Sequence, residues 1–321
     1  MAAMAAEQLN PIIDPGYGIN AIVIADTTDM QESDWLALRK NYIGASEVAA
    51  VLGLSKYRSA FGVYADKVLD VSDDLSGNIH IEFGNWMEPH IRAEFPKRFL
   101  KEEGIEIEAI AYPYMLQHPE HEFLSVNLDG LVIHPEYGVG VIEIKTAGEF
   151  QAKEWIDDEL PEQYYAQIQE ELSITGLDYA YVVALVGKRL IWKYIPRNND
   201  FIFAMTDLLV SFWNDHILAL EPPLPSGYDS DAATLKALYG SEESGTVVEM
   251  HDMQGYYDRY KEIANEIKIL SQEQEGIKQA FMQTMGEAEV GFVGNKKVTW
   301  KTTFRKGYEV KPTSFRAMRI G

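Results

Sequence analysis

The chain has 321 residues, of which 46% are hydrophobic and 24% charged, as is typical of a folded globular protein rather than a disordered one. It contains no cysteine, which excludes disulfides, thiolate zinc sites and cysteine nucleophiles, so any metal must be bound by oxygen or imidazole ligands. The formal net charge of −22 argues against an extensive DNA-binding surface, but it allows a local basic channel because salt screens charges beyond about 8 Å.

Hydropathy argues against two further classes of protein. No stretch approaches the ~20 consecutive apolar residues that a membrane-spanning helix needs. The N-terminus, MAAMAAEQLNPII, lacks the basic start and the apolar run of a secretory signal peptide. We therefore expect a cytoplasmic protein that makes no contact with a membrane.

The first elements of the chain are predicted to be mainly helical. Residues 1–28 predict a loosely ordered N-terminal arm, because their apolar residues follow no period and prolines and glycines interrupt them. Helical patterns follow over three segments, 34–42, 43–54 and 60–69. A fourth pattern around Met87 and Phe95 is interrupted at Pro96, which lacks the N–H that a helix interior needs.

The period then changes to the β-branched and apolar enrichment of strands. Extended stretches are predicted on both sides of a helix over 161–176, namely 105–117, 123–134, 138–147, 179–187 and 189–195. This order of elements predicts an α/β fold in which a mixed central sheet is flanked by helices.

A linker rich in proline and acidic residues places a domain boundary near Pro222. The chain is thereby divided into an arm (1–28), a core (29–221) and a C-terminal part (222–321), which comprises a linker, a helix and a tail. In the C-terminal part, residues 256–285 show apolar positions at alternating intervals of four and three.

This spacing predicts a helical arm packed on the core. A long rigid coiled coil is less favoured, because Gln274 falls on the apolar seam and Gly276 weakens the helix. The tail from Lys296 onward carries eight basic residues and a single acid, Glu309.

The most specific chemical pattern is VNLDGLV followed by VIEIKTA, which places Asp129, Glu143 and Lys145 on two consecutive strands. Side chains two apart on a strand project to the same face, so Glu143 and Lys145 point together. Ile142 and Ile144 then face the core. Two converging carboxylates would hold a hard cation such as Mg²⁺, and the lysine would position or deprotonate an attacking water.

Each part of this pattern also has a simpler explanation. Alternating Glu and Lys is common on an exposed strand edge, and Asp before Gly is common in turns. The apolar neighbours favour a site, because charged side chains within such runs must be paired or ligated.

Several ordered blocks carry a family resemblance: WLALRKNYIGASEVAAVLGLSKY, GNWMEPHI, NLDG, EIKT and YYAQIQEELSITGLDYAYVVAL. In order and spacing, from about Trp35 to Gly187, they resemble the lambda-exonuclease or YqaJ-type viral recombinases within the PD-(D/E)xK nucleases. The resemblance implies a restriction-endonuclease-like core, extended here by a C-terminal helical arm and a basic tail. One departure is Leu128 before Asp129, where the family has proline, and it leaves the carboxylate intact.

The resemblance implies roles for the matched residues. The metal site would comprise Glu88, Asp129, Glu143 and Ile144. It would bind Mg²⁺, with Mn²⁺ as a substitute, as two ions. Lys145 would be the catalytic lysine and Gln167 an active-site glutamine. Tyr164, one helical turn before Gln167, would contact DNA, although a solvated helix face and core packing are the alternatives for these two helix residues.

Arg39 and Ser46 resemble the block that binds the terminal phosphate of DNA in this family. Arginine can bind a phosphate through two N–H donors, and Ser46 would cap a helix whose N-terminal amides attract anions. The alternative is a surface arginine beside an N-cap serine. In the tail, Lys301, Arg305 and Lys306 are predicted either to contact DNA phosphates or to pair with acids in a strand-rich cap.

The implied reaction is hydrolysis of one strand of linear double-stranded DNA from an end, in the 5′ to 3′ direction, which leaves single strands for phage-type recombination in a bacterial host. The resemblance also implies a ring-like homo-oligomer such as a trimer, and a single-strand annealing protein as partner. Two rivals stay open. One is a PD-(D/E)xK endonuclease or single-strand-specific nuclease, and the other is a catalytically inactive DNA-binding or assembly protein.

Overall fold

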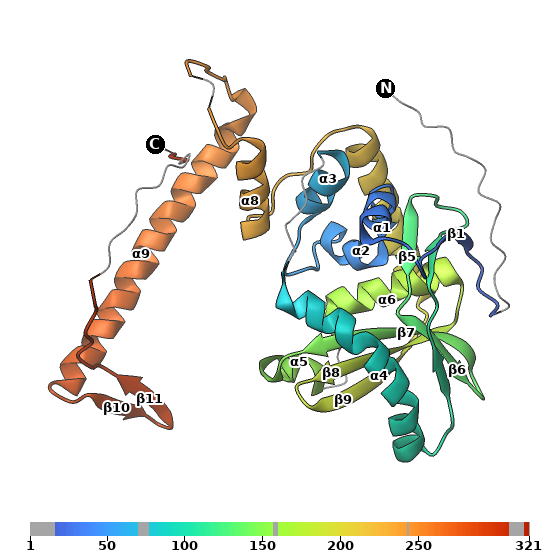
Figure 1. Ribbon diagram of the computed structural model, residues 1–321. Coiled ribbons are helices and arrows are strands. Elements are labelled where there is room, and N and C mark those ends of the chain that lie inside the picture. The colour runs from blue at the N-terminus through green and yellow to red at the C-terminus, as the bar shows by residue number, and fades with distance from the viewer. Residues whose placement is uncertain (1–16, 70–76, 157–159, 243, 308–317, 321) are drawn as a thin grey trace. The chain divides into compact units, whose positions relative to one another are not determined.

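The computed structural model describes residues 17–69, 77–156, 160–242, 244–307 and 318–320 (Figure 1). The chain divides into two compact units, Met1–Leu238 and Tyr239–Gly321, which are described separately. The division falls later than the boundary predicted near Pro222, because helix α8 (Asp229–Leu238) belongs to the first unit. There the buried Asp231 accepts a hydrogen bond of 2.5 Å from Ser59, the residue before helix α3 (Ala60–Val68).

A five-stranded mixed sheet forms the centre of the first unit. In spatial order its strands are β3 (Glu108–Ile110), β6 (Gly130–His134), β7 (Gly138–Ala147), β8 (Tyr179–Val186) and β9 (Arg189–Pro196). Strands β7 and β8 run parallel and are connected through helix α6 (Glu162–Thr175), as a parallel pair requires. The other neighbours are antiparallel. The predicted mixed α/β sheet is confirmed.

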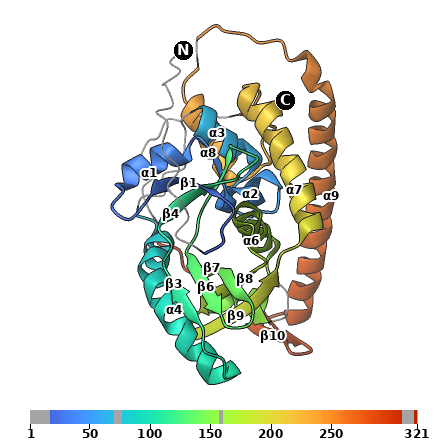
Figure 2. The same cartoon turned by 90° about the vertical axis from the view of Figure 1, so that its right-hand side faces the viewer.

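One long helix packs on each face of this sheet (Figure 2). Helix α4 (Ile79–Glu103) buries Phe95 against the face that carries Ile142 and Ile144. Helix α6 covers the opposite face. Because side chains alternate along β7, Glu143 and Lys145 project toward α6, so the long helix between β7 and β8 covers the predicted site.

Helix α4 is continuous over 25 residues, whereas the sequence predicted an interruption at Pro96. Pro89 and Pro96 both lie inside it and each lacks a main-chain N–H donor. The helix continues because Phe95 and Phe99, which flank Pro96 on its buried side, are held against the sheet.

A smaller sheet of four strands accompanies the central one. Its order is β1 (Ile22–Asp26), β4 (Tyr114–Gln117), β5 (Leu124–Asn127) and β2 (Ile43–Gly44). The prediction of a loose arm over 1–28 is therefore wrong for residues 22–26, because β1 pairs with β4 and buries Val23 in the core. The first 16 residues of that arm lie outside the described residues.

The chain passes from the small sheet to the central sheet at Leu128 and Asp129. The sequence predicted one strand over 123–134, but the two halves, β5 and β6, pair in different sheets. A Cβ atom on Gly130 would lie 2.3 Å from the main-chain oxygen of Ile110. Close packing of β6 on β3, rather than a hairpin turn, therefore requires the glycine after Asp129.

The remaining helices of the first unit are α1 (Glu32–Arg39), α2 (Ala45–Val51), α3 (Ala60–Val68), α5 (Lys153–Ile156) and α7 (Asn199–Phe212), with a π-helical turn at Trp213–Leu218 and a short 3₁₀ turn at Glu149–Gln151. Helices α1 and α2 correspond to the two predicted between residues 34 and 54. None of the described helices is both long and apolar enough to cross a lipid bilayer.

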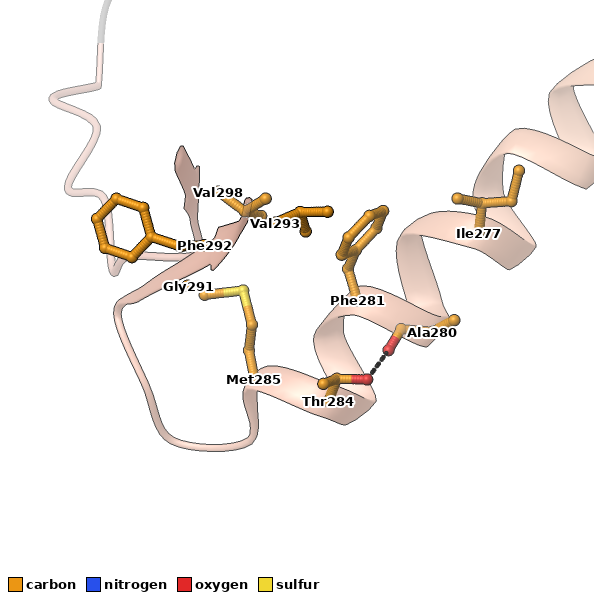
Figure 3. Close-up of a pocket in the computed structure, with 9 residues that line it drawn as sticks. All are labelled: Ile277, Ala280, Phe281, Thr284, Met285, Gly291, Phe292, Val293 and Val298. Carbon is orange, nitrogen blue, oxygen red and sulfur yellow. Dashed lines mark hydrogen bonds between the residues drawn. The ribbon is translucent and has the colours of Figure 1, made fainter. Parts of the chain in front are cut away.

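The second unit is built on helix α9 (Gln254–Met285), which confirms the helix predicted from the apolar spacing. A 3₁₀ turn at His251–Met253 precedes it, and the hairpin β10 (Val290–Val293) and β11 (Lys296–Thr299) follows. An apolar pocket of about 370 Å³ lies between the last turns of α9 and this hairpin (Figure 3).

Candidate active site

A single cavity of the first unit gathers most of the predicted site residues. It has a volume of about 730 Å³ and is lined from α1, α2, α4, α6, β5 and β7 and from the crossing between the two sheets. Eight of the predicted residues line it: Arg39, Ser46, Glu88, Asp129, Glu143, Ile144, Lys145 and Gln167. The predicted tail residues Lys301, Arg305 and Lys306 belong to the second unit.

Asp129 is held at the end of the β6–β7 ladder. The last paired residues of that ladder are Gly130 and Ile142, so the main-chain N–H of Ile144 lies beyond it. The Asp129 carboxylate accepts this N–H through Oδ2 at 2.7 Å. The side chain of Ile144 packs in the core beneath α4, so only its main chain faces the cavity side.

Glu143, Lys145 and Gln167 form a closed group of polar contacts. The Lys145 Nζ atom forms an ion pair with Glu143 and donates to Gln167 Oε1 at 3.2 Å. Gln167 Nε2 in turn donates to Glu143 Oε1 at 2.6 Å. Glu143 is 2% exposed, so its charge depends on these two partners rather than on water.

Tyr164 lies beside this group and is not among the residues that line the cavity. Its ring stacks on Trp155 with 5.4 Å between centroids, and Lys145 Nζ lies 5.2 Å from its centroid. The ring thus supports the lysine by a cation–π contact. The predicted contact of Tyr164 with DNA stays a prediction.

Glu88 reaches the cavity from α4. Its Oε1 accepts from Arg92 at 2.8 Å, one helical turn later. Arg92 also donates to the main-chain oxygen of Asp129. Arg92 therefore links Glu88 on α4 to the crossing that carries Asp129.

Acidic side chains in the cavity and directly beside it outnumber Lys145. Besides Asp129 and Glu143, the fully buried Glu171 accepts from Gln167 Nε2 at 3.0 Å. Burial raises the pKa of both Asp129 and Glu171 well above their usual values, and the nearby charge of Glu143 raises both further. Burial opposes charge on Lys145, but the two carboxylates outweigh it and raise its pKa.

This donor set fits a hard divalent cation. An excess of buried negative charge is stable only when paired or ligated, and Mg²⁺ prefers oxygen ligands. Across the described ranges, no three His, Asp or Glu side chains form a ready-made ligand group. Asp129 and Glu143 offer two carboxylates, and Mg²⁺ is commonly held by one or two carboxylates, with water and phosphate oxygens as the other ligands.

Arg39 and Ser46 form a second polar group at the cavity wall. Arg39 donates to Ser46 Oγ at 2.5 Å and stacks over Trp35 with 5.1 Å to the ring centroid. The cap of α2 is Gly44, not Ser46 as predicted, because the main-chain N–H of Gly44 donates to Glu47 three residues later. Ser46 is exposed within the first turn, so its hydroxyl and Arg39 face the same space.

A family model for the YqaJ-like viral recombinase domain matches residues 34–178. The matched span contains both polar groups of the cavity. This part of the chain is a YqaJ-like viral recombinase domain. An uncharacterised protein of Bacillus subtilis, named YqaJ, is 29% identical over 295 residues, which are 91% of this chain and 90% of that protein.

Two solved structures are also similar to the chain. An alkaline exonuclease from Laribacter hongkongensis is 20% identical, with a TM-score of 0.46 over 59% of this chain and 94% of its own. A phage-related exonuclease from Haemophilus somnus is 12% identical, with a TM-score of 0.39 over 58% of this chain and 99% of its own.

Three charged residues of the YqaJ-like domain were not predicted from the sequence. Arg92 and Glu171 each lie four residues after a predicted site residue, and this helical spacing was the available signal. Glu47 supports the Arg39 group from below, where it is buried and pairs with Arg58 at 3.0 Å and Lys67 at 2.9 Å. Its spacing from Gly44 is that of a capping box.

Glu170 of the same domain is a buried acid that does not line the cavity, and its raised pKa predicts how the stability of the protein changes with pH. It is fully buried, neither of its oxygens has a hydrogen-bond partner among the described residues, and burial raises its pKa from 4.5 to about 8. Between these values the unfolded chain has released the proton that the folded chain keeps, so the stability falls as pH rises.

We therefore expect Glu170→Gln to stabilise the protein relative to wild type at about pH 8, with a difference that shrinks toward about pH 5 by roughly 1 kcal/mol per pH unit. Chemical denaturation of both proteins across this range measures the difference. A difference that does not change with pH would contradict the raised pKa.

Proposed function

We propose that the chain is a divalent-cation-dependent exonuclease that degrades one strand of linear double-stranded DNA, from 5′ to 3′, and leaves single strands for recombination. The observation that carries this proposal is the convergence of Asp129, Glu143, Lys145 and Gln167 in one cavity with an excess of carboxylates. The YqaJ-like viral recombinase domain supports DNA as substrate.

Asp129 and Glu143 would hold Mg²⁺, or Mn²⁺ as a substitute, with the main chain of Ile144 beside them and Glu88 close to the bound water. The cation would polarise the scissile phosphate and lower the pKa of a bound water. Lys145 is fixed between Glu143 and Gln167, so its ammonium group can orient the attacking water and stabilise the charge that develops on the phosphate.

Lys145→Ala is expected to lower the rate of cleavage by about 10²–10³-fold or more, because it removes the positive group that faces the reacting phosphate. The variant is expected to fold but to unfold at a lower temperature than wild type, because the buried Glu143 loses its ion pair, so digestion is compared well below both unfolding midpoints. The measurement is digestion of end-labelled linear duplex with and without Mg²⁺, with product lengths resolved.

The same digestion separates the rival functions. Cleavage of a covalently closed duplex at a similar rate would identify an endonuclease, and cleavage of single strands alone would identify a single-strand-specific enzyme. A wild-type protein that binds duplex but leaves it intact with either cation would be a binding or assembly protein. A Lys145→Ala protein that cleaves at nearly the wild-type rate would remove the lysine from the proposal.

Arg39 is proposed to bind the 5′-terminal phosphate together with Ser46. Arg39→Ala is expected to slow digestion of 5′-phosphorylated ends roughly tenfold, which corresponds to the loss of a charge-assisted hydrogen bond. The same variant on dephosphorylated ends is the control and should differ little from wild type. An equal loss on both kinds of end would assign Arg39 a structural role.

The basic tail is proposed to contact phosphates outside the cavity through Lys301, Arg305 and Lys306. These residues are exposed, and Lys301 also lies 3.5 Å from Glu289, so pairing within the second unit competes with this role. Replacing all three by alanine is expected to reduce the log–log salt slope of duplex binding by about 0.9 per lost contact. A wild-type slope would favour the strand-rich cap instead.

A ring-like homo-oligomer around the duplex and a single-strand annealing partner stay predictions from the family resemblance.

A further inference from the structure

Glu171 is a buried carboxylate beside the cavity that neither the sequence motifs nor the proposed mechanism uses. It lies on α6 one turn after Gln167 and is fully buried. Its Oε1 accepts from Gln167 Nε2 at 3.0 Å, and its Oε2 has no hydrogen-bond partner in the described part of the chain.

The contacts of Gln167 show what this carboxylate does. A side-chain amide has two N–H donors at one end and an acceptor oxygen at the other. The oxygen accepts from Lys145, and the two donors are directed to Glu143 and Glu171. Glu171 therefore takes the donor that Glu143 leaves free, and the amide has no second orientation that satisfies its three partners.

The burial of Glu171 argues against a role in folding alone. A buried carboxylate next to two other carboxylates lowers stability unless it is paired or ligated, and a neutral residue of similar size would fill the same space. The presence of a glutamate at this buried position is therefore better explained by a role in the site than by packing of the core.

We propose that Glu171 is a positioning residue of the cation site, which fixes the amide of Gln167 and, through it, the carboxylate of Glu143 that binds the metal. This inference rests on the proposed cation-dependent function. The two can be tested separately, because this inference predicts a change in the affinity for the metal, whereas the proposed function predicts cleavage of DNA.

The test is the affinity for Mn²⁺ alone, measured by titration calorimetry on the full-length protein. Glu171→Gln is expected to weaken binding by about 10- to 100-fold, because its neutral amide oxygen is a weaker acceptor for Gln167 and its NH2 group adds a donor that competes for the Glu143 carboxylate. Glu170→Gln is the matched control, because it removes a carboxylate at the preceding position that is equally buried and has no hydrogen-bond partner among the described residues. It should change the affinity less than about twofold, within the error expected for sites that do not interact.

A double-mutant cycle then tests whether Glu171 acts through the amide. In a Gln167→Leu background, Glu171→Gln should add little to the loss already present, because residues in one hydrogen-bond network are not additive. Losses that multiply would overturn the proposed route. Wild-type Mn²⁺ affinity in Glu171→Gln, or an equal loss in Glu170→Gln, would overturn the role itself.

Folding and function are separated by two further measurements. Without metal, the unfolding temperature of Glu171→Gln should be at least that of wild type. If this variant alone fails to fold, Glu171 is needed for the core and the proposal is overturned. If wild type cleaves DNA with Mg²⁺ but Glu171→Gln binds Mn²⁺ normally, only this inference fails. If Glu171→Gln binds Mn²⁺ more weakly than wild type and Glu170→Gln does not, but wild type cleaves no DNA, the proposed function fails and this inference stands.

Discussion

The hydrogen bond from the Ile144 N–H to the Asp129 carboxylate joins the two sheets where the chain passes from one to the other. It supplies an acceptor to a strand whose neighbour has ended, and it sets one carboxylate beside Glu143 and Lys145. Gly130 makes the crossing possible, since any side chain there would collide with the main chain of β3. The site is therefore a consequence of the sheet topology, because Asp129 stands at the crossing from β5 in the small sheet to β6 in the central sheet.

The fold also requires that charge be concentrated beneath α6. Both faces of β7 are covered by helices, so Glu143 and Lys145 cannot be a solvated strand edge, and their charges must be balanced within the structure. The lysine balances one carboxylate, whereas Asp129 and Glu171 are left with raised pKa values. These buried carboxylates thus lower the stability of the first unit, and a divalent cation bound between them would raise it again.

Much of the central sheet and of the candidate site could be predicted from the sequence. The alternation in VIEIKTA fixes which side chains share a face, and the strand–helix–strand order fixes the parallel pair, since both depend on local geometry. The break between β5 and β6 could not be predicted, because both halves have the same strand pattern and only their pairing differs. The interruption predicted at Pro96 was wrong for a similar reason. Packing of Phe95 and Phe99 on the sheet outweighs the tendency of proline to break a helix. Arg92 and Glu171 were missed because their roles depend on which way a helix faces, which only the packed structure fixes.

The pairing of the cations explains how an acidic protein could still select a DNA end. Lys145 and Arg92 each pair with a carboxylate in or beside the cavity, and so do Arg58 and Lys67 beneath α2. Arg39, in contrast, donates to the neutral hydroxyl of Ser46 and stacks on Trp35, and within the described part of the chain no carboxylate forms a direct ion pair with it, although the charge of Glu47 lies near. A phosphate that approached this wall would gain a charged hydrogen bond without breaking an existing ion pair, which is the condition under which such a contact contributes most to binding. Under the proposed function, the overall charge of −22 would disfavour binding along the length of a duplex, while Arg39 would still attract one terminal phosphate to the cavity.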